Sequence, residues 1–299
     1  MPLFFVLSGF VIHYSYSKSN NKSWETFFTR RFFRLYPAYL LALAVAFVIA
    51  NRTMHIGSPI RDLLFHIFLI HNFFNSTIYS VNPAMWSLAT EIQLYLLYPL
   101  MLFATSKLGF DRFIKVLFVV TAIAYLVLII SNRGIDTPNP ALWRNTGLLW
   151  FQWVLGAYLA ECYLNSKRLF HHPKTWTGIL GPLIVIMSFM QPLSQFAYSC
   201  AALLFAVIIE AVLSTTNKPP KSLKFLGNLG ICSYSFYLWH QPLLQILLRR
   251  LEPLKIENEA VKTGALVILA LVVIGPMSWG LYRFVEQPFQ AIGKKLTAK

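Results

Sequence analysis

Two ionisable side chains lie inside long apolar segments of the sequence, where a charge is costly. Glu91 is the only charged residue of segment 85–106, and His240 lies near the middle of segment 232–250, two residues before Pro242. A charged residue at the centre of a membrane helix costs about 2.5–3.5 kcal/mol unless it is paired or lines a wet cavity. Both side chains could therefore act as acid–base catalysts. The structural alternatives are a Glu that joins two helices through an Arg, and a satisfied packing histidine.

A cluster of arginines forms the second candidate site. Arg30, Arg31 and Arg34 stand among aromatic residues, directly before Tyr36 and Pro37. If this run is helical, Arg30 and Arg34 lie one turn apart on one face. Guanidinium groups match phosphate geometry, so the cluster could bind a nucleotide-containing cofactor or a phospholipid headgroup. The alternative is a topology anchor, with Pro37 in the first turn of the helix that follows.

The remaining polar features have simpler explanations. Glu286 is expected to pair with Arg283, and the Ser8-Gly9 step to form a notch for close helix packing. No zinc-ligand spacing or phosphate-cradling Gly loop is present, so the sequence predicts no metal site. The widely separated cysteines are interpreted as small apolar packing residues: Cys162, Cys200 and Cys232.

The composition indicates the class of fold that must position these residues. Of the 299 residues, 57% are hydrophobic, 16% aromatic and only 12% charged. About 25% would be charged in an ordinary soluble domain. A soluble domain, a disordered chain, a coiled coil and a disulfide scaffold are thereby excluded. We predict an all-α polytopic membrane bundle, in which roughly 20 residues per helix leave room for about nine spanning helices.

Apolar runs mark the candidate spans, and the run at 60–75 is doubtful because it carries Arg61, Asp62, His66 and His71. If this run does not cross, 18 of the 26 Lys and Arg residues fall on one side; if it crosses, the split is 11 against 15. The positive-inside rule therefore favours nine crossings, with 60–75 re-entrant or interfacial and the C-terminus cytoplasmic. The formal charge of +15 then reflects membrane topology rather than nucleic-acid binding. The full set of runs is 2–17, 36–51, 60–75, 85–106, 113–131, 147–165, 177–191, 196–213, 232–250 and 261–284.

No linker or repeat divides the sequence, and the run Lys218-Pro219-Pro220-Lys221 indicates a loop, so residues 1–299 are expected to form one domain. The first apolar run follows Met1 at once and would span only about 24 Å as a helix. It looks like a helix entered partway along its length.

The order of these motifs resembles the acyltransferase-3 family of integral membrane acyltransferases, which includes acetylases of O-antigen and other surface polysaccharides. Five elements carry the resemblance, from one end of the chain to the other. They are Phe4-Phe5-Val6-Leu7-Ser8-Gly9-Phe10, Arg30-Arg31-Phe32-Phe33-Arg34-Leu35-Tyr36-Pro37, Trp86-Ser87-Leu88-Ala89-Thr90-Glu91, Tyr234-Ser235-Phe236-Tyr237-Leu238-Trp239-His240-Gln241-Pro242 and Val285-Glu286-Gln287-Pro288.

The resemblance implies a ten-helix bundle in the cell membrane, most simply the bacterial inner membrane. Such a protein takes an acyl group, usually acetyl from acetyl-CoA, at the cytoplasmic face and transfers it to a hydroxyl of an envelope glycan or related acceptor. It implies that Arg30, Arg31 and Arg34 bind the donor. Acyl-CoA is then a donor substrate rather than a bound cofactor, and the other expected partners are the glycan or lipid-linked acceptor and the bilayer, with no nucleic acid.

One family element is not found. The family's first helix carries an Arg and a His separated by ten residues, the His being its general base, whereas Arg61 and His71 are separated by nine and lie in another segment. We therefore expect this chain to lack that helix, and consider His13 and His240 as substitutes, His13 being close to Lys18 and interpreted as interfacial. Glu91 and His240 are expected to flank the acceptor path. The alternative functions are a transporter or lipid-linked sugar flippase, and an inactive truncated acyltransferase.

Overall fold

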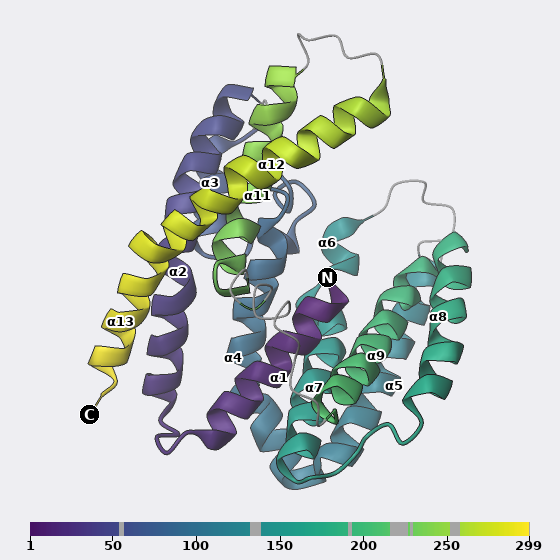
Figure 1. The fold of residues 1–299 in the computed structure, drawn as a ribbon. Helices are drawn as coiled ribbons and strands as arrows, with labels where there is room; N and C mark the ends of the chain where they lie inside the picture. Colours follow the sequence, from purple (N-terminus) through teal and green to yellow (C-terminus); the bar gives the residue numbers. More distant parts are fainter. Residues whose placement is uncertain are drawn as a thin grey trace. The chain divides into compact units, whose positions relative to one another are not determined.

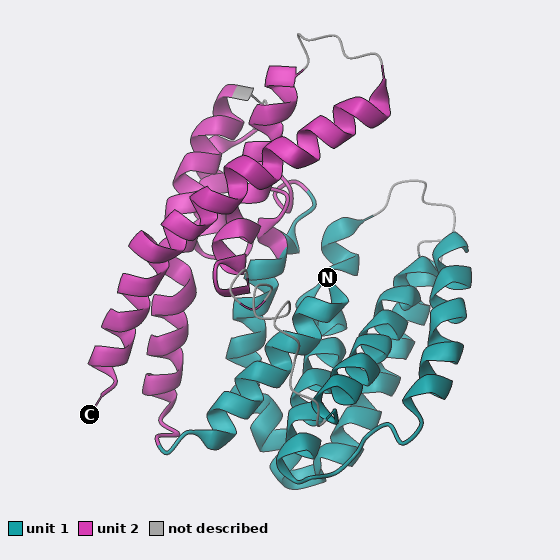
Figure 2. Cartoon of the chain, viewed as in Figure 1, with its two compact units in different colours: residues 1–20, 72–75, 87–217 teal, residues 21–71, 76–86, 218–299 magenta. Residues whose placement is uncertain are grey.

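The computed structural model describes all residues except 54–56, 132–138, 191–192, 216–226, 228–229, 252–257 and 299, and the described part contains helices and no strands (Figure 1). It divides into two compact units: residues 1–20, 72–75 and 87–217 form unit 1, and residues 21–71, 76–86 and 218–299 form unit 2 (Figure 2). The principal helices are α1 (Pro2–Lys18), α2 (Trp24–Thr53), α3 (Pro59–Ile67), η1 (His71–Phe73), α4 (Met85–Leu108), α5 (Phe110–Ser131), α6 (Pro140–Trp143), α7 (Thr146–Leu164), α8 (Pro173–Phe189), α9 (Ser194–Leu213), α11 (Ser233–Leu251), α12 (Glu259–Leu281), the π-helical turn η3 (Tyr282–Glu286) and α13 (Gln287–Leu296).

Helix α7 lies at the centre of unit 1. It contacts α1, α5 and α9, and α8 packs on α9. Most of its residues from Thr146 to Cys162 are buried on every side of the helix. A helix that is apolar all round is a core helix, because it has no polar face to present to solvent.

Two glycines allow α1 and α7 to touch through their backbones. A Cβ atom on Gly9 would lie 1.9 Å from the carbonyl oxygen of Trp153, and one on Gly156 would lie 1.9 Å from that of Val6. No side chain fits at either position, so close approach of the two helices requires glycine. The notch expected at Ser8-Gly9 is confirmed, and its partner on α7 is Gly156.

Unit 2 is built around α2, which contacts α3, α11, η3 and α13. Tyrosine hydroxyls connect these helices: Tyr39 donates to the His66 carbonyl at 2.8 Å, Tyr36 to the Ile67 carbonyl at 2.9 Å, and Tyr234 to the Leu35 carbonyl at 2.8 Å. The first two bonds reach carbonyls in the last turn of α3, where the His66 carbonyl also accepts from the Leu69 N–H.

Among the residues that the structure describes, five helices are long and apolar enough to cross a membrane: 24–52, 85–108, 110–131, 194–213 and the continuous stretch 259–296. Their apolar residues are not hidden inside the protein. On α5, for example, Val116, Val120 and Ile123 are each more than half exposed. An exposed apolar surface of this extent belongs in lipid, so the chain is a helical membrane protein.

The helix boundaries follow the predicted apolar runs closely, with two differences. Pro37 lies well inside α2 rather than in the first turn of a helix, since α2 begins at Trp24 and includes the arginines. The run at 60–75 forms the nine-residue α3 and the short η1. Nine residues extend only about 14 Å, so α3 cannot cross a bilayer. The expected loop at 218–221 lies outside the described residues.

The contact between α1 and α7 leads to a first prediction. Gly9→Ala and Gly156→Ala should each lower the free energy of unfolding by about 1–3 kcal/mol, because the added methyl group meets a backbone carbonyl that cannot move aside. Reversible unfolding in mixed detergent micelles measures the loss. The matched control is Gly178→Ala on α8, where a Cβ would meet nothing within 4 Å. Equal free energies of unfolding for Gly9→Ala and this control would contradict the proposed contact.

Candidate functional site

Glu91 lies in unit 1 at the centre of a chain of hydrogen bonds. Its Oε1 accepts from the Ser8 hydroxyl at 2.9 Å and from the Tyr95 hydroxyl at 2.5 Å. The indole Nε1 of Trp153 donates to the Ser8 oxygen at 3.2 Å. Glu91 is 6% exposed, so these donors replace the water that the carboxylate would otherwise bind.

Each partner of Glu91 is positioned by its own helix. Tyr95 is one turn beyond Glu91 on α4, so its side chain shares the same helix face. Ser8 precedes Gly9, whose contact with the Trp153 backbone also brings the indole of Trp153 to the Ser8 hydroxyl. Ser8 and Gly9 therefore have two roles: Gly9 allows α1 to pack closely on α7, and Ser8 donates a hydrogen bond to the Glu91 carboxylate. The i,i+4 spacing could have indicated Tyr95 as a partner, whereas nothing in the sequence indicated Trp153.

His13 lies in a second polar cluster of unit 1. Its Nδ1 lies 3.0 Å from the Tyr98 hydroxyl, and its Nε2 lies 3.0 Å from Oε2 of Glu161. The position of His13 at the membrane interface stays a prediction, and the residue is buried within unit 1, being only 3% exposed. The sequence did not show this because its partners, on α4 and α7, lie 85 and 148 positions away.

A polar cavity of about 440 Å³ adjoins this cluster. Both charged and hydroxyl-bearing side chains face it, among them Asp111, Glu161 and Lys167. The Tyr158 hydroxyl donates to Asp111 Oδ1, and Asn165 donates to Glu161 Oε1 at 2.9 Å. The complete lining is His13, Leu102, Thr105, Ser106, Phe110, Asp111, Tyr158, Glu161, Cys162, Asn165 and Lys167.

His240 lies in unit 2, half-buried on α11. Its Nδ1 lies 2.6 Å from the Tyr237 carbonyl oxygen. A carbonyl can only accept, so Nδ1 carries the proton and, in the neutral ring, Nε2 carries the lone pair of a base. The surrounding motif anchors the helix: Tyr237 donates to the Ala84 carbonyl at 2.6 Å, and Ser235 donates to Glu286.

The three arginines lie on one helix, α2, but they differ in environment. Arg30 and Arg34 are exposed, and Arg30 Nε donates to the Thr297 hydroxyl at 2.8 Å. Arg31 is half-buried, with its guanidinium 5.6 Å from the centre of the Phe27 ring. Because Thr297 directly follows α13, two further exposed cations belong to this end of unit 2: Lys294 and Lys295.

Glu286 does not form the expected pair with Arg283. It accepts from Ser235 and interacts electrostatically with Arg34, while Arg283 donates to Gln287 at 2.6 Å. The π-helical turn at 282–286 shifts the register here, so spacing for an ordinary α-helix gave the wrong partner. Glu286 instead connects α11 with the arginine-bearing helix α2.

The histidines of the 60–75 run are buried in unit 2. His66 and His71 stack with ring centres 3.8 Å apart. Burial lowers the pKa of His66 to about 4, and burial together with His66 holds the pKa of His71 well below its usual 6.5. Both rings are therefore neutral at physiological pH, which is how a segment with several ionisable groups can be buried.

The predicted site residues divide between the two units. Glu91 belongs to unit 1, whereas Arg30, Arg31, Arg34 and His240 belong to unit 2. Within unit 2, Tyr234 of the His240 motif bonds the carbonyl of Leu35, the residue after Arg34. The arginine run and the histidine motif are thus joined by a direct hydrogen bond between their helices.

Comparison with known proteins gives the family. The acyltransferase domain of the acyltransferase-3 family matches residues 1–282. The chain belongs to this family.

Several relatives are named for acetyl transfer. The chain is 27% identical to the O-acetyltransferase OatA of Staphylococcus aureus, over 99% of this chain and 53% of that protein. It is 26% identical to the putative peptidoglycan O-acetyltransferase YrhL of Bacillus subtilis, over 98% and 50%. An uncharacterized protein of Haemophilus influenzae is 31% identical over 63% of this chain and 84% of its own length.

The chain thus spans about half the length of OatA and YrhL. No solved structure matches it.

The pair of His13 and Glu161 generates a second prediction. His13→Gln and Glu161→Gln should each lower the free energy of unfolding by about 1–2 kcal/mol, because each leaves a polar partner with a weaker bond. The double variant should lose about 1 kcal/mol less than the sum. Unfolding in mixed micelles measures all four proteins, and His171→Gln, at an exposed position, is the control. Strictly additive losses would show that the two side chains do not interact.

Proposed function

We propose that the protein transfers an acyl group, acetyl in the simplest case, from acyl-CoA to a hydroxyl of an envelope glycan or related acceptor. Membership of the acyltransferase-3 family and relatives named as O-acetyltransferases support this reaction. The observation that carries it is the buried Glu91 carboxylate held by Ser8 and Tyr95. A carboxylate kept in an apolar helix by hydroxyl donors is suited to take a proton from an acceptor hydroxyl.

Proton transfer is assigned to Glu91 and His240. O-acylation needs a base to remove the hydroxyl proton as the new ester bond forms, and an acid to protonate the departing thiolate. Glu91 supplies an ionisable oxygen and His240 supplies Nε2, which carries the lone pair of the neutral ring when Nδ1 donates to the Tyr237 carbonyl. The role of each residue is proposed separately, because Glu91 belongs to unit 1 and His240 to unit 2.

Donor binding is assigned to Arg30, Arg31 and Arg34. The phosphates of coenzyme A are polyanionic, and the exposed Arg30 and Arg34 lie one turn apart on α2. The lysines of α13 add positive charge at the same end of unit 2. Fixed guanidinium groups favour phosphate through bidentate hydrogen bonds, which a flexible amine cannot provide.

The proposal also includes the orientation of the protein in the membrane. With α3 too short to cross, nine crossings place 18 of the 26 Lys and Arg residues, including these arginines, on the cytoplasmic side. The C-terminus is then cytoplasmic and the membrane is the bacterial inner membrane. Cytoplasmic acyl-CoA would meet the arginines, and the acceptor would be acylated from the opposite face.

The function is tested with membranes that contain the protein and acetyl-CoA labelled in its acetyl group. Label should pass into envelope glycan as an ester that mild base releases, and membranes without the protein should give none. If the label stays in acetyl-CoA with every envelope fraction offered as acceptor, the proposed reaction is wrong.

A third prediction concerns the acid–base residues. Glu91→Gln keeps an acceptor for Ser8 and Tyr95 but removes the basic oxygen, so kcat should fall by about 100-fold or more. The kcat of His240→Gln should fall by a similar factor, while KM for acetyl-CoA should change little in both variants. Glu259→Gln, at an exposed position on α12, is the matched control. Activities of Glu91→Gln and His240→Gln equal to that control would remove both residues from the mechanism.

A fourth prediction concerns the arginines. Arg30→Ala and Arg34→Ala should each raise KM for acetyl-CoA by about tenfold, since each removes charge-assisted bonds to phosphate. The effect should disappear with acetyl-pantetheine, a thioester donor without the nucleotide phosphates. Arg283→Ala is the control, because Arg283 is an exposed cation of the same unit. Equal losses with both donors would mean that the arginines stabilise the fold rather than bind phosphate.

A further inference from the structure

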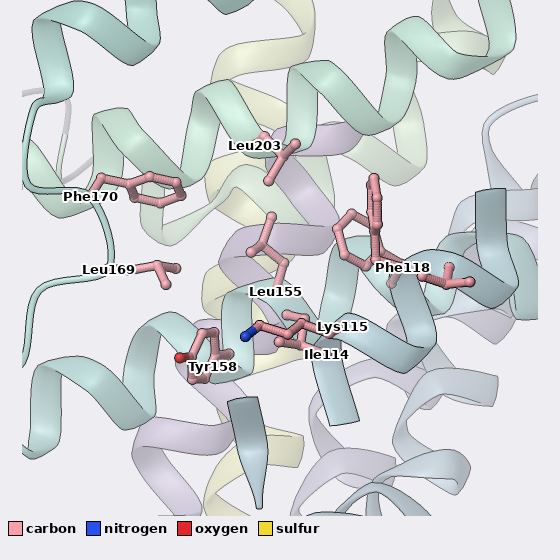
Figure 3. A pocket seen from close by; sticks show the side chains of 10 residues that line it. Ile114, Lys115, Phe118, Leu155, Tyr158, Leu169, Phe170 and Leu203 are labelled. Carbon is pink, nitrogen blue, oxygen red and sulfur yellow. The ribbon is translucent and has the colours of Figure 1, made fainter. Parts of the chain in front are cut away.

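Unit 1 carries an apolar groove that the acyl-transfer reaction does not use. Its volume is about 400 Å³, within the range of about 300–1,000 Å³ typical of small-molecule sites. Figure 3 shows Phe118, Leu155 and Leu203 along the groove, and the Lys115 ammonium on the side of Tyr158. The lining residues come from α5, α7, α9 and the connection before α8.

A buried carboxylate holds one wall of this groove in place. Glu210 of α9 accepts hydrogen bonds from the backbone N–H groups of Leu169 at 2.6 Å and Phe170 at 2.7 Å. Glu210 is 7% exposed, and Leu169 and Phe170 both line the groove. Charge-assisted bonds of this kind fix the connection, so the groove is part of the folded structure rather than a chance gap.

The groove lies beside a surface that faces lipid. Val116, Val120 and Ile123, on the same helix as Lys115 and Phe118, are each more than half exposed. Apart from Lys115 and the Tyr158 hydroxyl, the side chains that line the groove are hydrocarbon. Such a lining cannot satisfy a hydrated polar ligand, but it matches an acyl chain from the surrounding bilayer.

The charges at one end of the groove complement an anionic headgroup. Lys115 lines the groove, Arg112 precedes it by one turn, and Lys167 and Arg168 precede Leu169 in the clamped connection; all four cations are exposed. Of the neighbouring carboxylates, Glu161 interacts with His13 and Glu210 with backbone amides, while Asp111 accepts from Tyr158. The cations therefore outnumber the acidic groups around this end.

Tyr158 lines both this groove and the polar cavity that contains Lys167. An apolar groove with exposed cations at one end fits a molecule with an apolar tail and an anionic head. We propose that unit 1 binds one anionic glycerophospholipid of the bilayer. One acyl chain lies in the groove along Phe118, Leu155 and Leu203, and the phosphate lies at Lys115.

The proposal is tested by lipid binding to the purified, delipidated full chain, followed by native mass spectrometry. The probes are phosphatidylglycerol and phosphatidylcholine with identical acyl chains. The protein should retain phosphatidylglycerol about fivefold more strongly, the effect expected for one basic side chain at an anionic lipid. Lys115→Ala should abolish this preference, and raising the salt concentration should weaken it. An unchanged preference in Lys115→Ala would overturn the headgroup assignment.

Two further variants test the acyl-chain assignment. Leu203→Trp fills the groove and should reduce retention of both lipids by a similar factor, whereas Lys262→Ala removes a lysine of unit 2 and should change neither. Leu203→Phe is a milder filling variant to use if the Trp variant fails to fold. Undiminished lipid retention by a folded filling variant would overturn the proposal. The test does not depend on acyl transfer, so the site and the reaction can fail separately.

Discussion

The contact between Gly9 and Gly156 determines how the polar interior of unit 1 is assembled. Because a Cβ at either position would collide with a carbonyl of the other helix, α1 and α7 can approach only through these two glycines. The approach brings Trp153 to Ser8, and Ser8 in turn reaches Glu91 on α4. Further along the same helices it brings His13 to Glu161. A packing constraint that involves no polar side chain thus positions both polar clusters.

This arrangement also explains why a carboxylate is tolerated at Glu91. In an apolar helix an isolated charge would be too costly, and the usual remedy is a neighbouring cation. Here Oε1 receives two hydroxyl donors, one from its own helix and one from α1. Hydroxyl donors compensate a carboxylate without neutralising its charge, which is compatible with the acid–base role proposed for Glu91.

The sequence predicted the elements of this fold better than their partners. Apolar runs located the main helices within a few residues, except that α2 begins at Trp24 rather than at residue 36, and the ionisable residues of 60–75 correctly set apart the run that forms α3 and η1. Long-range pairs were inaccessible: Glu161 lies 148 positions from His13, and no local periodicity encodes that distance. Local rules also failed at Glu286, where a π-helical turn changes the neighbours that α-helical spacing would give. The site roles of Glu91, His240 and the arginines, like the nine-span topology, stay predictions.

The distribution of polar groups suits the two substrates of the proposed reaction. The buried polar groups around Glu91 and His13 are carboxylates and hydroxyls, which bind the hydrogen-bond donors of an alcohol. Exposed guanidinium and ammonium groups gather instead at one end of unit 2, where they can bind phosphate without a large desolvation cost. An anionic donor would be repelled by the first environment, and a neutral acceptor would gain little from the second. In the proposed reaction, donor binding is thus assigned to unit 2 alone, whereas the acid–base residues Glu91 and His240 are divided between the two units.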